Sequence, residues 1–187
     1  MRRGFKTQCE NRAAEVRHAL NLGPIAPLNP WAYAQYLNVV VLNFRELGLS
    51  TKSVRQLTVD DDESWSAMTI KEAGTFGIVL NPAHATTRQH NDLTHELAHI
   101  ELRHTPARVE VSKSGLLLLS DYSDEQEQEA DWHAGALLVP RAGLIHHRAR
   151  HKSTEDIAQH YGISPALCEW RLRMTGVDVQ MGRTRFR

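Results

Sequence analysis

His95, Glu96 and His99 are spaced as H-E-x-x-H, a pattern that can bind a metal ion. On a helix, residues four positions apart lie on the same face, so both histidines can direct a ring nitrogen at one divalent ion. Glu96 lies about 100° further round the helix, where its carboxylate could act on a water at that ion without binding the ion. The motif therefore predicts a catalytic Zn²⁺ site with Glu96 as the general base.

Two other interpretations of the motif predict no catalysis. A structural zinc site would need four protein ligands and usually cysteines, and Cys9 and Cys168 are distant from the motif in the sequence. Because the chain contains 11 histidines, a chance pair of surface histidines that binds no metal remains an alternative.

A catalytic zinc site also needs a third protein ligand. His104 follows His99 by five residues, whereas the metzincin pattern needs six and an intervening glycine, so that subclass is excluded. The remaining source is a downstream helix that bears an acid. Glu127 and Asp131 share a face there, so we expect Glu127 to bind the metal and Asp131 to accept a hydrogen bond from a ligand histidine. Glu129 points away by about 200° and is the second choice for the third ligand.

The residues before the motif predict two helices and several short strands. Asn29 followed by Pro30 is typical of a helix start. Residues 39–42 predict a short buried strand, and residues 65–69 and 76–80 predict an antiparallel hairpin. The first helix is predicted from apolar residues at spacings of three and four, which are Phe5, Cys9, Ala13, Val16 and Leu20.

The motif itself lies in a predicted helix that ends before Pro106. A strand at residues 76–80 precedes this helix, as in the zincins, which bind substrate along a sheet edge beside the metal-binding helix. Residues 107–122 show no clear pattern. The apolar face of the helix comprises Leu93, Leu97 and Ile100, with His104 on the same face.

Helical patterns continue to the end of the chain. Asp124 is expected to cap a helix that ends at Pro140, and two further helices meet at Gly162, the second capped by Ser164. Strands therefore come early and helices late, which favours an α+β fold over an alternating α/β fold. We expect a zincin-like arrangement in which a small antiparallel or mixed sheet packs on the metal-binding helix, followed by a helical C-terminal part.

The chain is expected to form one compact unit over residues 1–187. Residues 5–140 are predicted to be the zincin-like core, residues 141–176 a helix-turn-helix-like tail, and residues 177–187 a flexible end.

Composition limits the class of protein. Lysine plus arginine and aspartate plus glutamate both number 22, so no net charge attracts the chain to nucleic acid or to a membrane. The longest apolar run, residues 116–119, is far shorter than the roughly 20 residues that span a bilayer, and the opening residues lack an apolar signal core. Two distant cysteines suit a reducing compartment. The sequence therefore predicts a cytoplasmic globular protein.

Taken together, the motifs resemble the ImmA/IrrE family of metallopeptidases. The resemblance rests on the H-E-x-x-H helix, on E-x-E-A-D at residues 127–131, and on Leu-Leu-Val-Pro at residues 137–140. Residues 78–82, Arg88 and the tail segments at 157–158, 161–164 and 171–172 are also similar, so the resemblance covers about residues 5–176.

The resemblance implies a gluzincin-like cytosolic protease of bacteria or their phages. His95, His99 and Glu127 match the zinc ligands of the family, and Glu96 matches its general base. Such proteins typically cleave a partner helix-turn-helix transcriptional repressor and so release a stress, defence or mobile-element programme.

The chain departs from the family pattern at two positions. Asn91 replaces an apolar residue before the metal-binding helix, and His133 stands where the family usually has phenylalanine. His133 lies about 200° round the helix from Asp131, and we interpret it as a partly buried polar substitution rather than a metal ligand. Nothing in the spacing of Cys9 requires it to bind the metal.

The basic C-terminal part leaves other functions open. Its two helices around Gly162 could form a helix-turn-helix in which Arg171 and Arg173 contact phosphates, or they could simply complete the core. The competing hypotheses are a DNA-binding regulator with a vestigial metal site and a zinc hydrolase that acts on small molecules. Salt-sensitive DNA affinity without bound zinc would favour the regulator. Further basic residues near these helices are Arg148, Arg150 and Lys152.

Overall fold

The computed structural model describes residues 1–111 and 117–185 and has the predicted α+β fold. The elements before the motif are α1 (Phe5–Ala19), α2 (Pro30–Tyr36), β1 (Val40–Leu42), α3 (Thr51–Arg55), β2 (Ala67–Glu72) and β3 (Thr75–Leu80). The motif helix is α4 (Thr86–Glu101), followed by β4 (Arg108–Val111), β5 (Leu117–Ser120) and α5 (Asp124–Leu138). The tail contains α6 (Arg141–Ala149), α7 (Thr154–Tyr161), α8 (Pro165–Thr175) and α9 (Val177–Arg185).

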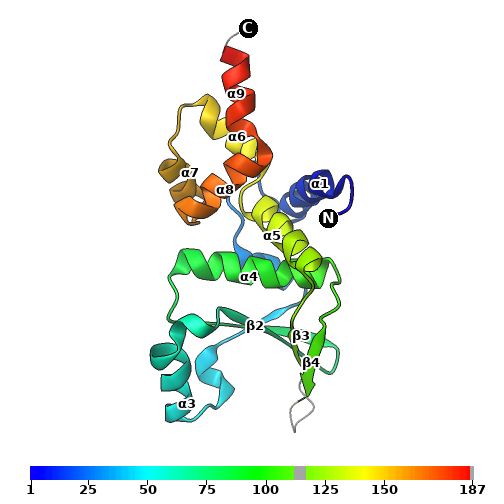
Figure 1. Ribbon diagram of the computed structural model, residues 1–187, viewed down its shortest axis with the longest axis vertical. Helices are drawn as coiled ribbons and strands as arrows, with labels where there is room; N and C mark the ends of the chain where they lie inside the picture. The colour runs from blue at the N-terminus through cyan, green and yellow to red at the C-terminus, as the bar shows by residue number, and fades with distance from the viewer. Residues whose placement is uncertain (112–116, 186–187) are drawn as a thin grey trace.

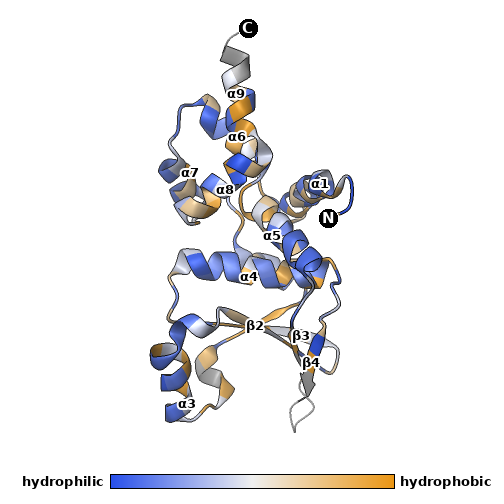
Figure 2. Ribbon diagram, in the orientation of Figure 1, coloured by the Kyte–Doolittle hydropathy of each residue, from blue (hydrophilic) through white to orange (hydrophobic). Residues whose placement is uncertain are grey.

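Helix α4 lies across the middle of the molecule, with the sheet on one side and α5 on the other (Figure 1). Its apolar residues Leu93 and Leu97 are buried in a core shared with α1, α2, β3 and α5. Even so, Figure 2 shows mostly polar colours along α4. A polar helix in a central position has to satisfy its side chains with partners from its neighbours.

The sheet has the strand order β1-β3-β2-β5-β4, with β1 parallel to β3 and the other neighbours antiparallel. The predicted hairpin is confirmed. Ala73 and Gly74 form its turn at φ values of 46° and 88°, the left-handed region that two-residue hairpin loops use.

The strand before α4 does not lie at an edge of the sheet. β3 is internal, because β1 pairs with it in parallel on the side away from β2. β1 is itself an edge strand rather than the buried strand predicted for residues 39–42, and Val40 is 48% exposed. The outer strands of the sheet are therefore β1 and β4.

Residues 107–122, which show no clear pattern in the sequence, contain β4 and β5. These strands pair with each other and extend the sheet beyond β2. Their pairing is tertiary, since the register joins Val109 to Leu119 and Leu119 to Thr69. The part of the predicted apolar run that falls at residue 116 lies outside the described residues.

The start of α5 differs by one residue from the prediction. Ser123, not Asp124, caps the helix: its hydroxyl accepts a hydrogen bond from the Gln126 amide, and the Gln126 side chain bonds back to the Ser123 amide. This reciprocal capping box satisfies two amides that the first turn leaves without helical partners.

Two buried arginines hold the C-terminal end of α5. Arg17 of α1 donates a hydrogen bond to the Leu137 carbonyl at 2.6 Å. Arg171 of α8 donates to the Val139 carbonyl and pairs with Glu10 at 2.5 Å. Arg171 is 0% exposed, so of the two alternatives for this residue it completes the core and does not contact phosphates.

The tail helices share a second core. The predicted break at Gly162 is confirmed by its φ of 64°, and Ser164 caps α8 by accepting a hydrogen bond from the Leu167 amide. Much of the end that was expected to be flexible is helical: α9 begins at the buried Val177 and packs on α6, where Figure 2 shows apolar residues on both helices. Residues 186–187 of that end lie outside the described residues. This core comprises Leu138, Val139, Leu144, Ile157, Ala158, Tyr161, Ile163, Cys168, Leu172 and Val177. None of the described helices has the length and hydrophobicity needed to cross a membrane.

The carboxylate of Glu101 at the end of α4, with a side chain only 10% exposed, joins this helix to three others. Glu101 accepts hydrogen bonds from Arg12 Nε at 2.6 Å, from the Tyr33 hydroxyl, and from His133 Nε2 at 2.5 Å. Burial alone would raise the pKa of Glu101, but these donors outweigh it and lower the pKa to about 2. The charged carboxylate therefore stabilises the contact of α4 with α1, α2 and α5.

We expect Glu101→Gln to lower the free energy of unfolding of the metal-free protein by about 3 kcal/mol at neutral pH, since each pKa unit corresponds to about 1.4 kcal/mol. The folded-state pKa lies below the ordinary value of 4.5. The stabilisation is therefore complete above that value and is lost as the pH falls towards about 2. Urea unfolding at neutral pH and at several acidic pH values measures the difference between wild type and variant.

Glu15→Gln is the matched control, because Glu15 also pairs with Arg12 but is 65% exposed. We expect it to stay within about 0.5 kcal/mol of wild type. Equal losses for the two variants, or a Glu101→Gln difference that does not shrink in acid, would contradict the assignment.

Candidate metal centre

Packing of α4 against α5 brings the predicted site residues together. His95 and His99 come from α4, and Glu127 comes from the first half of α5. One ligand atom from each of these residues lies within 4.8 Å of the other two. Glu129, the second choice for this position, is not in the group and instead faces His104.

The distances within this group fit a single small cation. His95 Nε2 lies 3.0 Å from His99 Nε2 and 3.1 Å from Glu127 Oε2, and His99 Nε2 lies 3.6 Å from Glu127 Oε2. A tetrahedral zinc ion with bonds of about 2.0–2.1 Å sets its ligand atoms about 3.3 Å apart. Two imidazole nitrogens and one carboxylate oxygen are also a donor set that catalytic zinc sites use. These three residues could therefore hold zinc.

Both histidines have a second partner on the Nδ1 side of the ring. His95 Nδ1 lies 3.1 Å from Asp131 Oδ1, the contact that the sequence predicts for Asp131. His99 Nδ1 lies 3.0 Å from His104 Nδ1. Contacts of this kind orient a ring so that Nε2 is directed at the metal.

Burial and neighbouring charges act differently on the two rings. Burial lowers the pKa of His99 to about 3, together with the nearby His95 and His104. Burial also lowers the pKa of His95, but the hydrogen bond with Asp131 and the charges of Glu96 and Glu127 outweigh it and raise the pKa above the usual value. The acidic residues of α5 thus create a local field that favours a cation between the helices.

Glu96 lies beside the group without joining it. Its carboxylate accepts a hydrogen bond from the Thr69 hydroxyl of β2 through Oε2. Burial raises the pKa of Glu96, although Thr69 and His95 oppose the shift. A carboxylate with a raised pKa is a stronger base, so Glu96 is suited to accept a proton.

Two residues of the site show no signal in the sequence. Tyr122 stacks on His99 with ring centroids 3.7 Å apart and the planes at 25°. Thr69 comes from the middle of the sheet and contacts Glu96. Tyr122 lies in the stretch without a clear pattern, although its place just before the Ser123 cap of α5 could have drawn attention to it.

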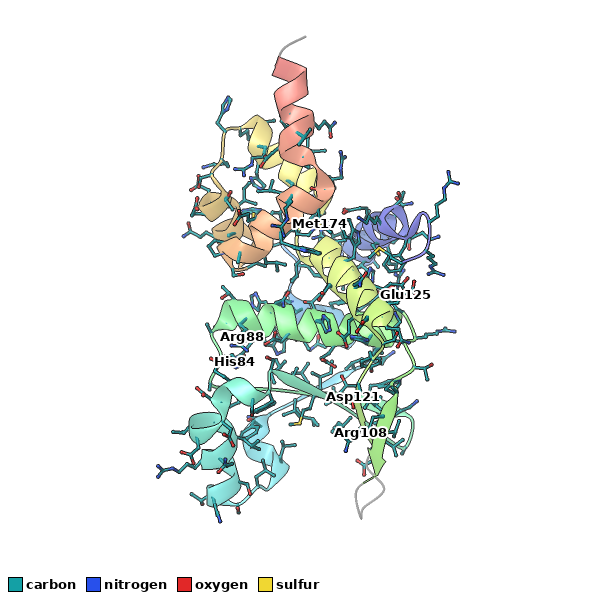
Figure 3. All side chains as sticks on the ribbon, in the orientation of Figure 1. His84, Arg88, Arg108, Asp121, Glu125 and Met174 are labelled. Carbon is teal, nitrogen blue, oxygen red and sulfur yellow. The ribbon has the colours of Figure 1, made fainter. Side chains whose placement is uncertain are left out.

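Arg88, which is shared with the family pattern, lies at the N-terminal end of α4 and not at the metal centre (Figure 3). It pairs with Glu63 at 2.7 Å and donates a hydrogen bond to the Ser66 hydroxyl at 3.1 Å. Its contacts therefore tie the start of α4 to the segment before β2.

Cys9 and His133 also lie outside the group. Burial raises the pKa of the Cys9 thiol to about 12, with help from the charge of Glu10, so the thiol stays protonated. His133 is buried fully rather than partly, at 1% exposure, and pairs with Glu101.

The family model for Peptidase M78, described as the IrrE N-terminal-like domain, matches residues 35–173, which is more than half of the chain. The chain belongs to this family. The resemblance to the ImmA/IrrE metallopeptidases is therefore confirmed, although the match begins after α1 and not at residue 5. The matched range contains α4 and α5, which carry the group of residues that could hold a metal ion. No curated protein and no solved structure matches the chain.

We expect Glu127→Ala to lower zinc affinity by more than the roughly 100-fold that the loss of an outer-shell partner can cost. Glu129→Ala should cost roughly tenfold or less, because Glu129 lies outside the group of ligand atoms. Competition with a chromophoric chelator measures both affinities. The assignment of Glu127 would be wrong if the Glu129 variant lost zinc while the Glu127 variant kept it.

Proposed function

We propose that this M78-family metallopeptidase is a zinc-dependent endopeptidase that hydrolyses a peptide bond in a partner protein. The observation that carries the proposal is the convergence of His95, His99 and Glu127 on one point beside the partly buried Glu96. We propose that the partner is a helix-turn-helix transcriptional repressor, whose cleavage releases a stress, defence or mobile-element programme. Both cysteines are free and buried, which suits the reducing cytoplasm as its place of action.

In this proposal His95, His99 and Glu127 hold the metal, and Asp131 orients His95. A bound zinc ion supplies Lewis acidity, which polarises a peptide carbonyl and acidifies water. Glu96 accepts a proton from the attacking water and passes it to the leaving amine. The Thr69 hydroxyl donates a hydrogen bond to Oε2 of Glu96 and so orients the carboxylate that receives and delivers the proton.

The substrate segment in this proposal is extended. A peptide that adds to a sheet edge must offer its own backbone groups, which a stable helix cannot do. β4 is the outer strand beside β5, and β5 leads into Tyr122, which stacks on His99. We propose that the cleaved segment pairs with β4, where Val109 is 47% exposed.

A DNA-binding regulator with a vestigial metal site is the alternative of a different class. The buried Arg171 cannot contact phosphates, and Arg148 pairs with Asp178 at 2.9 Å. The groove along α8 is lined by Glu155 and Glu169 as well as by basic residues. These acids repel a phosphate backbone, so the peptidase is the better-supported function.

Glu96→Gln should leave zinc content and fold intact while abolishing turnover. Glutamine keeps the shape and the hydrogen bond from Thr69 but cannot accept a proton at neutral pH. General-base catalysis is worth roughly 10²–10⁴ in rate, or about 3–5 kcal/mol of barrier. Elemental analysis measures the zinc content, and gel electrophoresis measures cleavage of a helix-turn-helix repressor.

His99→Ala is the companion variant, because it removes a ligand and should release the metal. A zinc-loaded Glu96→Gln protein that cleaves at the wild-type rate would refute the mechanism. Wild-type protein without zinc, but with salt-sensitive affinity for DNA, would favour the regulator.

The position of the cleaved peptide bond in the repressor is the subject of a separate prediction. We expect mass spectrometry of the repressor fragments to place the cleaved bond in an exposed loop that can become extended. A bond within a stable helix would contradict strand pairing with β4.

A further inference from the structure

After α4 ends, the chain turns back so that the next residues contact the last turn of the helix. Arg103 adopts a left-handed φ of 56°. The His104 amide then donates to the His99 carbonyl at 3.0 Å, and the Arg103 amide donates to the Ile100 carbonyl at 3.1 Å. This is the Schellman arrangement, in which the second residue past the cap bonds to the carbonyl five positions back. It brings His104 against His99, although His104 lies beyond the helix.

The His104 side chain bridges two groups. Its Nδ1 lies 3.0 Å from His99 Nδ1, and its Nε2 lies 3.5 Å from Glu129 Oε2. The His104 side chain is 6% exposed and that of Glu129 is 15% exposed. Water therefore competes little for these contacts.

We propose that Glu129 and His104 are positioning residues that hold His99 in the tautomer with its proton on Nδ1, leaving Nε2 for the metal. This inference rests on the proposed metal site. It adds a chain of contacts from Glu129 through His104 to the ligand His99, which we call the relay.

The arrangement of protons follows from the contacts. His99 Nε2 is the atom directed at His95 and Glu127, so in the metal-binding form the proton of His99 sits on Nδ1. That N–H needs an acceptor, and the atom opposite it is His104 Nδ1. His104 accepts there only when its own proton is on Nε2, and the Glu129 carboxylate, 3.5 Å from Nε2, favours that position through its negative charge.

The relay gives each acid of the E-x-E-A-D segment a different contact. Glu127 faces the two Nε2 atoms, and Asp131 contacts His95 Nδ1 directly. Glu129 lies on another face of α5 and reaches His99 only through His104. One helix therefore serves both rings, although they lie one turn apart on α4.

The test measures metal binding by variants of the full chain, without reference to peptidase activity. We expect His104→Ala to lower zinc affinity roughly 10–100-fold, as outer-shell losses typically do. His104→Asn should return the affinity to within about fivefold of wild type, because its amide oxygen can take the place of Nδ1 as acceptor. Glu129→Ala should cost roughly three- to tenfold. Gln128→Ala, at an exposed position of the same helix, is the matched control and should bind zinc as wild type does.

Cobalt substitution supplies a spectroscopic readout that a loss of general stability would not move. The visible absorption of the Co²⁺-loaded His104→Ala protein should differ in position and intensity from that of wild type, and His104→Asn should restore it. If His104→Ala fails to fold, Glu129→Ala and His104→Asn still test the relay.

Wild-type zinc affinity in both His104→Ala and Glu129→Ala would overturn the relay, as would a His104→Asn variant no better than His104→Ala. Either result leaves the proposed function standing, because wild type still binds zinc. Wild-type protein that binds no zinc would instead refute the proposed function.

Discussion

The contact between α4 and α5 determines the rest of the site, because it buries polar side chains that must find partners across the interface. A buried polar or charged group without a partner costs several kcal/mol. Only a narrow range of helix positions and rotations satisfies all of these groups at once, and that range also brings Glu127 of α5 to the histidines of α4. The pairs with little exposure are His104 with Glu129 and Glu101 with His133, and His95 also contacts Asp131, whose side chain is 61% exposed.

Local features of the site could be predicted from the sequence. The spacing of His95 and His99 places both on one helix face whatever surrounds the helix. The caps at Asn29 and Ser164 depend on hydrogen bonds to amides two or three residues away. The shared face of Glu127 and Asp131 is likewise a property of α5 alone. Each of these predictions needed only the geometry of a single element.

Features that depend on tertiary contacts could not be predicted in the same way. β5 forms a strand because it pairs with β2, and β4 because it pairs with β5, and nothing in residues 107–122 shows these partners. The contact of His104 with Glu129 requires both the left-handed turn at Arg103 and the crossing of two helices. The chemistry of Arg171 suggests a phosphate contact, but it lies buried against Glu10, distant in sequence.

The helical tail takes part in positioning the metal centre. A Cβ atom on Gly135 of α5 would lie 2.7 Å from Arg171 Cδ and 2.8 Å from Trp170 Cζ3, so glycine there lets α8 approach α5 closely. Arg171 can then reach the Val139 carbonyl and Glu10 of α1. The C-terminal end of α5 is thereby held from two sides, and because a helix is stiff, this anchorage also sets where Glu127 lies near the other end. The tail segment around Arg171, which resembles the family pattern, thus supports α5 and the candidate metal centre rather than contacting nucleic acid.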